Sequence, residues 1–110
     1  NENFFIMFGL YPNSYKEMQA IFQKYEAIEK VVIYGSRAKG NYKEGSDIDV
    51  TLFGELNYDL IIKLKHEFED SNIPYLVDIS IYEDLQSETL KEHIDRVGKV
   101  FYEINRNENN

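Results

Sequence analysis

The sequence predicts a small α/β domain in which a mixed sheet packs against helices. Apolar residues at helical spacing alternate along the chain with short β-branched runs, in the order helix, strand, turn, strand, helix, strand, helix. The chain has 110 residues, of which 43% are hydrophobic, so it is long enough for one packed core. We therefore expect a single domain over residues 1–110, with helices mainly on one face of three or more strands. Residues 1–12 and 105–110 are expected to be flexible ends.

The first helix is expected to begin just after Pro12, where Ser14-Tyr15-Lys16-Glu17 has the form of a capping box. Its apolar positions recur at helical spacing: Tyr15, Met18, Ile21, Phe22, Tyr25 and Ile28. The β-branched run at 30–34 predicts a buried strand. Gly35-Ser36 directly after this run predicts a turn, followed by one turn of helix. A second strand is predicted over 48–53.

Three further elements are predicted in the second half of the chain. Asn57 can cap a long helix, whose inner face would carry Leu60, Ile61, Leu64 and Phe68. Residues 74–82 predict a third strand, in which proline is tolerated at the first position. Ser87 can cap another helix that ends at Gly98. The apolar residues of that helix are Leu90, Ile94 and Val97. Residues 100–104 are apolar enough to pack back on the core.

A Gly-Ser turn followed after ten residues by Asp-x-Asp is the most informative feature of the sequence. Gly35 and Ser36 end the first predicted strand, and Asp47 and Asp49 begin the second. A glycine lets backbone N–H groups approach phosphate oxygens closely, and a helix that begins there adds favourable electrostatics. Two carboxylates one pleat apart can hold Mg²⁺, which prefers oxygen ligands and completes its shell with water and phosphates. The motif therefore predicts a site for a polyphosphate bound with its metal.

A third carboxylate, Asp78, lies inside the apolar third strand, where aspartate is disfavoured. Side chains alternate between two faces along a strand, so Asp47 and Asp49 share the polar face of the second strand. The same alternation places Asp78 and Ser80 on the polar face of the third. The opposite, apolar faces would carry Ile48, Val50 and Leu52 in one strand and Val77, Ile79 and Ile81 in the other. If the two strands are neighbours, three carboxylates converge on one side of the sheet.

Other motifs and residues do not carry comparable chemistry. A Walker A loop would need Lys and then Ser or Thr after Gly40, where Asn41-Tyr42 stands. A calcium loop that opened at the first aspartate of Asp-x-Asp would need glycine where Leu52 stands. His66 and His93 lie in polar stretches of the predicted helices, so we expect them to be surface residues.

The charge balance and the absence of cysteine exclude several classes of function. The net charge is −8, from 20 acidic and 12 basic residues, which favours a basic protein partner and disfavours direct nucleic-acid binding. The sequence holds no cysteine, which excludes disulfides, thiolate nucleophiles and sulfur-ligated zinc. No apolar run approaches the length of a membrane span, and no signal peptide is evident in the first ten residues. We therefore expect a cytoplasmic protein that does not enter a membrane.

Over most of the chain, these residues resemble the minimal nucleotidyltransferase (MNT) family, single-domain members of the DNA polymerase beta superfamily. The resemblance implies the small polymerase beta-like nucleotidyltransferase fold. It also implies that Asp47 and Asp49 bind Mg²⁺, while Asp78 completes a site for a second ion and is the candidate general base. Gly35-Ser36 would contact the β- and γ-phosphates of ATP. Arg37 would neutralise developing charge there, or else remain a solvated loop charge.

Family members of this size are typically antitoxins encoded beside a HEPN-type RNase toxin. The resemblance therefore implies transfer of AMP from ATP to a hydroxyl of that toxin, on a tyrosine. The oligomeric state stays open between a monomer and a homo- or hetero-oligomer. Two alternatives stay open: a binding module that inhibits the toxin by complex formation, and a small-molecule nucleotidyltransferase of the aminoglycoside-modifying kind. All three motif carboxylates are present, which favours an enzyme.

Overall fold

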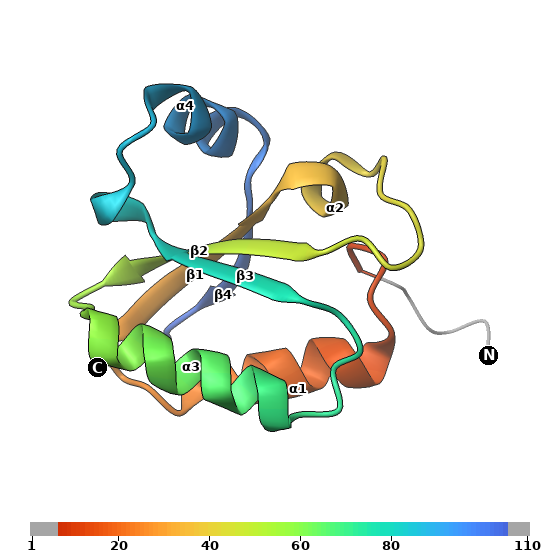
Figure 1. Cartoon of the computed structure of the whole chain (residues 1–110), viewed down its shortest axis with the longest axis horizontal. Coiled ribbons are helices and arrows are strands. Elements are labelled where there is room, and N and C mark those ends of the chain that lie inside the picture. The colour runs from red at the N-terminus through yellow and green to blue at the C-terminus, as the bar shows by residue number, and fades with distance from the viewer. Residues whose placement is uncertain (1–6, 106–110) are drawn as a thin grey trace.

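Four strands form one mixed sheet in the order β3-β2-β1-β4 (Figure 1). The computed structural model describes residues 7–105. In chain order the elements are α1 (Pro12–Gln23), β1 (Ile28–Tyr34), α2 (Gly35–Lys39), β2 (Ile48–Gly54), α3 (Tyr58–Asp70), β3 (Val77–Ile81), a 3₁₀ turn (Tyr82–Asp84), α4 (Glu88–Val97) and β4 (Lys99–Glu103). The predicted order of helices and strands is confirmed, and the apolar segment after α4 is a fourth strand.

The pairing of the strands places polar side chains in one row across the sheet. β1 is antiparallel to β2 and β4, whereas β2 runs parallel to β3. The parallel pair is possible because α3 carries the chain back along the sheet between the two strands. The register sets Tyr34 of β1 opposite Asp49 of β2, and Asp49 opposite Asp78 of β3. The row therefore runs over three strands that are separated in the sequence.

Helices cover both faces of the sheet. α1 and α3 lie along one face, whereas α4 and the short α2 lie on the other side (Figure 1). The expectation that helices cover mainly one face was therefore wrong. The physical reason lies in β1, where Val32 and Tyr34 are buried in a separate cluster with Ile94 of α4. A strand that is apolar on both faces needs cover on both, because leaving apolar surface in water is unfavourable.

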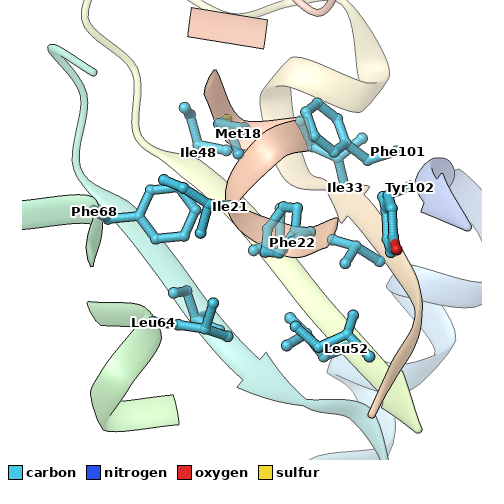
Figure 2. Close-up of a cluster of buried hydrophobic side chains, with 14 of the residues drawn as sticks. Met18, Ile21, Phe22, Ile33, Ile48, Leu52, Leu64, Phe68, Phe101 and Tyr102 are labelled. Atoms are coloured by element: carbon cyan, nitrogen blue, oxygen red, sulfur yellow. The ribbon is translucent and has the colours of Figure 1, made fainter. Parts of the chain in front are cut away.

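The main core lies between the sheet and the pair of helices α1 and α3 (Figure 2). Phe22 of α1 is fully buried there. The ring of Phe22 lies edge-on to Phe68 of α3 and to Phe101 of β4, with centroids 5.7 and 6.0 Å apart. The core also contains the predicted apolar face of β2: Ile48, Val50 and Leu52. Because side chains alternate along β2, its polar face points away from this core.

Two predicted helix caps are confirmed and the third prediction was wrong. The side chains of Asn57 and Ser87 each accept a hydrogen bond from the backbone N–H three residues further on, at 3.0 and 3.1 Å. The capping box at Ser14 is not the start of α1, which begins at Pro12 and buries Ser14 inside it. Proline suits the first helical position because its φ angle is already helical and its missing N–H would have no partner there.

The bounds of β3 differ slightly from the prediction, whereas those of α4 agree with it. β3 begins at Val77, three residues later than expected, although the Ile48 N–H still donates to the Leu76 carbonyl at 2.9 Å. Gly98 ends α4 as predicted, with an ordinary φ of −65°. A side chain at Gly98 would not have enough room, because a Cβ atom there would lie 2.5 Å from the Ile94 carbonyl oxygen.

The flexible ends expected at 1–12 and 105–110 lie largely outside the described residues. Within 7–12, Met7 and Leu10 form a bridge that closes a turn, and the Leu10 side chain is fully buried. This turn comes directly before α1 in the chain. Among residues 7–105, no helix combines the length and apolar character needed to cross a membrane.

Candidate active site

The Gly-Ser turn lies directly against the carboxylate of Asp49. Gly35 has a φ angle of +73° at the point where β1 turns into α2, a conformation that glycine adopts without strain. A Cβ atom at Gly35 would lie 2.5 Å from Oδ2 of Asp49. The backbone angle therefore favours glycine, and a side chain at this position would have to displace the Asp49 carboxylate. As a consequence, the backbone at Gly35-Ser36 lies beside a carboxylate of the Asp-x-Asp motif.

Three carboxylates gather on the polar face of β2 and β3. Asp49 and Asp78 stand opposite each other on parallel strands about 4.8 Å apart, and Asp47 comes just before β2. Burial raises the pKa of Asp49 above its ordinary value, and the Asp78 and Asp47 carboxylates raise it further. The charges of His93 and Arg37 lower the pKa of Asp49. The site therefore concentrates negative charge that a bound cation would offset.

The donor atoms of this site suit Mg²⁺, but they are not drawn together as one ligand set. Within residues 7–105, no three His, Cys, Asp or Glu side chains lie close enough to form a metal-binding group. Asp47 and Asp78 are exposed, whereas Asp49 is half-buried. The binding of two Mg²⁺ ions therefore stays a prediction. It is supported by the oxygen donors of the site and by the repulsion between Asp49 and the neighbouring carboxylates.

Tyr34 belongs to the same row, although no pattern in the sequence marks it as a site residue. Its side chain is 7% exposed. Burial raises the pKa of the Tyr34 phenol, a hydrogen bond with Ser80 lowers it, and the Asp49 and Asp78 carboxylates raise it. The Ser80 hydroxyl also donates to the hydroxyl of Thr51 on β2, at 2.9 Å. Hydroxyl groups therefore continue the polar row beyond the carboxylates.

His93 of α4 faces this row, so the expectation that it is a surface residue was wrong. The imidazole is half-buried and lies edge-on to the Tyr34 ring, with centroids 6.1 Å apart. His66, the other histidine, is exposed as expected. A signal for His93 was present in the sequence, since it lies three residues after Leu90 and four before Val97. This spacing places His93 on the inner stripe of the helix.

Arg37 is buried, so the interpretation of it as a solvated loop charge was wrong. Its side chain is 2% exposed. Nε and Nη2 donate to the Ser46 carbonyl at 3.0 and 2.6 Å, and Nη1 donates to the Phe8 carbonyl at 2.9 Å. Because all three nitrogens already bind backbone oxygens, this geometry does not support the predicted direct contact between Arg37 and a phosphate.

A short helix that begins beside carboxylates on a mixed sheet is the arrangement expected of a nucleotidyltransferase domain. The chain belongs to the family described as Polymerase beta, Nucleotidyltransferase, whose sequence profile matches residues 16–107. The match extends from α1 through β4, so it includes the Gly-Ser turn and all three carboxylates. The predicted family and the predicted polymerase beta-like fold are confirmed.

A curated relative shares part of this sequence. The chain is 40% identical over 48 residues to a candidate protein adenylyltransferase of Methanocaldococcus jannaschii. The match covers 43% of this chain and 48% of the relative, so it spans about half the length of that protein.

Solved toxin–antitoxin structures share the fold. A chain of a toxin–antitoxin crystal structure with AMP-PNP aligns with a TM-score of 0.66 at 16% identity, over 82% of this chain and 73% of that one. A second match comes from the tri-AMPylated Shewanella oneidensis HEPN toxin in complex with its MNT antitoxin. Its TM-score is 0.62 at 14% identity, over 84% of this chain and 71% of that one. At these identities the comparison establishes the architecture.

Proposed function

We propose that this domain transfers AMP from ATP to a protein hydroxyl with the help of Mg²⁺, and so acts as the antitoxin of a HEPN-type RNase toxin. The observation that carries the proposal is the close approach of the turn to the carboxylate. The backbone of Gly35 lies so near Asp49 that a Cβ atom there would displace the carboxylate. A triphosphate bound at this turn would lie beside a carboxylate, and their repulsion calls for a cation between them.

Each motif residue has a distinct role in this proposal. Gly35-Ser36 would bind the β- and γ-phosphates through backbone N–H groups and the serine hydroxyl. Asp47 and Asp49 would hold the ion that accompanies the triphosphate, and Asp78 would contribute to a second ion. When bound, Mg²⁺ supplies charge neutralisation at the attacking and leaving oxygens of a phosphoryl transfer.

The proposed reaction is an in-line displacement at the α-phosphorus of ATP. The acceptor oxygen forms a bond to this phosphorus while the bond to the bridging oxygen breaks, and pyrophosphate leaves. The hydroxyl proton would pass to Asp78, whose carboxylate is exposed on the polar face of the sheet and can be reached from outside. Asp49 is half-buried in the middle of the row and is less accessible to an acceptor.

Two observations support the proposed acceptor: the structural relatives and the net charge of the chain. One structural relative is a complex in which a HEPN toxin is AMPylated and bound to an MNT antitoxin. The present chain has a net charge of −8, which favours association with a basic protein surface. We therefore infer that the acceptor is a tyrosine of a HEPN-type toxin. This partner would supply the acceptor surface.

A second candidate function is inhibition by complex formation alone. The observation that favours it is that the three carboxylates share one face of the sheet without forming a metal-binding group, within the described part of the chain. In this alternative the nucleotide site survives without turnover, and the toxin is silent only while the antitoxin is bound.

Intact mass spectrometry distinguishes the two candidates. A HEPN-type RNase toxin is incubated with the domain, ATP and Mg²⁺, and the two proteins are then separated. Under the enzymatic proposal the toxin gains the mass of AMP at one or more tyrosines and stays inactive after separation. An unmodified toxin that recovers its RNase activity would decide for inhibition by binding. Omission of Mg²⁺ provides the control for cation dependence.

A further inference from the structure

The buried guanidinium of Arg37 holds the loop that leads into Asp47. A buried charge is unfavourable unless hydrogen bonds compensate for the lost water. Two of its three nitrogens bind a single acceptor, the Ser46 carbonyl, at 3.0 and 2.6 Å. That carbonyl belongs to the peptide unit that joins Ser46 to Asp47. The forked contact therefore fixes the orientation of the peptide unit directly before the first carboxylate.

Few other contacts hold this loop. Residues 41–45 are all exposed, and the backbone at Gly40 and Gly45 has left-handed φ angles of +90° and +84°. Two local hydrogen bonds close a turn: the Ser46 N–H donates to the Lys43 carbonyl at 3.0 Å, and the Lys43 N–H donates to the Ser46 hydroxyl at 2.9 Å. These bonds shape the tip of the loop but do not tie it to the rest of the fold, whereas Arg37 does.

Aromatic rings and a distant turn keep the Arg37 side chain in place. The guanidinium carbon lies 4.6 Å from the ring centroid of Tyr75 and 5.4 Å from that of Tyr42. Nη1 reaches the Phe8 carbonyl in the turn before α1. Gly9 of that turn packs so closely that a Cβ atom would lie 2.4 Å from the Tyr42 ring. Arg37 of α2 thus joins the loop to two other segments of the chain, the turn before α1 and the segment that contains Tyr75.

We propose that Arg37 is a positioning residue for the nucleotidyltransferase site, which acts on Asp47 through the Ser46 carbonyl. It holds the peptide unit before Asp47 so that this carboxylate stays beside Asp49. The catalytic part of this inference rests on the proposed function. The holding of the loop can be measured without nucleotide, metal or partner.

Amide hydrogen exchange of the free protein tests the holding directly. The amides of Lys43 and Ser46 are hydrogen-bonded, so their exchange reports opening of the loop. Arg37→Lys keeps the positive charge but cannot donate from two nitrogens to one carbonyl while reaching Phe8. We expect exchange of both amides to become about tenfold faster. Lys39→Gln, which removes an exposed charge from the same short helix, should leave their exchange unchanged.

Tyr42→Ala provides a second variant if Arg37→Lys does not fold. Tyr42 is 37% exposed, so its truncation disturbs the core little while it removes one ring from the guanidinium. Exchange of the Lys43 and Ser46 amides should become about threefold faster. Unchanged exchange in every folded variant would overturn the proposal.

The Mg²⁺ dependence of AMP transfer separates positioning from direct contact with substrate. In Arg37→Lys the Asp47 carboxylate should be held less firmly. The Mg²⁺ concentration that gives the half-maximal rate should therefore rise about tenfold, while kcat at saturating Mg²⁺ is largely retained. A fall in kcat at every Mg²⁺ concentration, with unchanged amide exchange, would show that Arg37 touches the phosphates and would overturn positioning. If wild-type protein transfers no AMP but exchange responds as expected, the proposed function fails and the holding of the loop stands.

Discussion

Alanine at Gly35 should damage nucleotide binding far more than it damages the fold. Gly35 is the first residue of α2 and Gly40 is its C-cap, with φ angles of +73° and +90°, so alanine at either position adopts an unfavourable left-handed backbone. Their surroundings differ. A Cβ atom at Gly35 would lie 2.5 Å from Oδ2 of Asp49, whereas a Cβ atom at Gly40 would meet no described residue within 4 Å beyond its neighbours in the chain. Gly40→Ala is therefore a matched control for backbone strain.

The two variants should lose similar stability. The left-handed backbone costs about 1–2 kcal/mol for a residue with a side chain. The atom that the new methyl group meets in Gly35→Ala is the end of the Asp49 side chain, which can rotate away at little further cost. A fall of 1 kcal/mol in the free energy of unfolding lowers Tm by about 4–8 °C in a domain of this size. We expect each variant to melt about 4–16 °C below wild type.

The difference between the variants should appear when ligand is added. Tm is measured in EDTA and again with Mg²⁺ and a non-hydrolysable ATP analogue. A ligand at about 100 times its Kd stabilises a protein by about 2.7 kcal/mol, and Gly40→Ala should keep this gain. Gly35→Ala should lose most of it, because its Asp49 carboxylate has turned away from the turn. Equal stabilisation of both variants by the ligand would refute the reasoning.

Three further predictions concern the carboxylates. Mg²⁺ with ATP should raise the Tm of wild type more than either alone, because the carboxylates repel an uncomplexed triphosphate; an equal rise with ATP in EDTA would contradict a metal-bridged site. Asp49→Asn should raise Tm at neutral pH without metal. The folded-state pKa of Asp49 is raised, so its contribution to stability is complete below the unfolded pKa and is lost as the pH rises through the folded pKa. The gain should therefore vanish in acid, and a constant gain from about pH 3 to pH 7 would exclude this cause. Asp47→Asn and Asp78→Asn should each abolish AMP transfer, followed with label on the α-phosphate, without loss of the fold; a wild-type rate in either variant would remove that residue from the site.

The faces of the strands and the helix caps at Asn57 and Ser87 were determined by the sequence alone, because both depend on short-range geometry. A period of two places Asp49 opposite Ile48 and Val50 in any extended strand, so the polar face of β2 followed directly from the order of residues. The caps at Asn57 and Ser87 span only three residues, and their hydrogen bonds form as predicted. The ten-residue spacing between Gly-Ser and Asp-x-Asp identified the family for the same reason, since it is a property of one continuous segment.

The tertiary structure alone decided which of these residues meet. Arg37 is buried because a turn 29 positions away in the sequence supplies the Phe8 carbonyl, a contact that no local pattern encodes. His93 reaches the row only because α4 closes over the second face of β1, where Tyr34 lies. The register that sets Asp49 opposite Asp78 likewise depends on how far α3 carries the chain before β3. Periodicity tells which side chains share a face, whereas long-range packing selects their neighbours across the sheet.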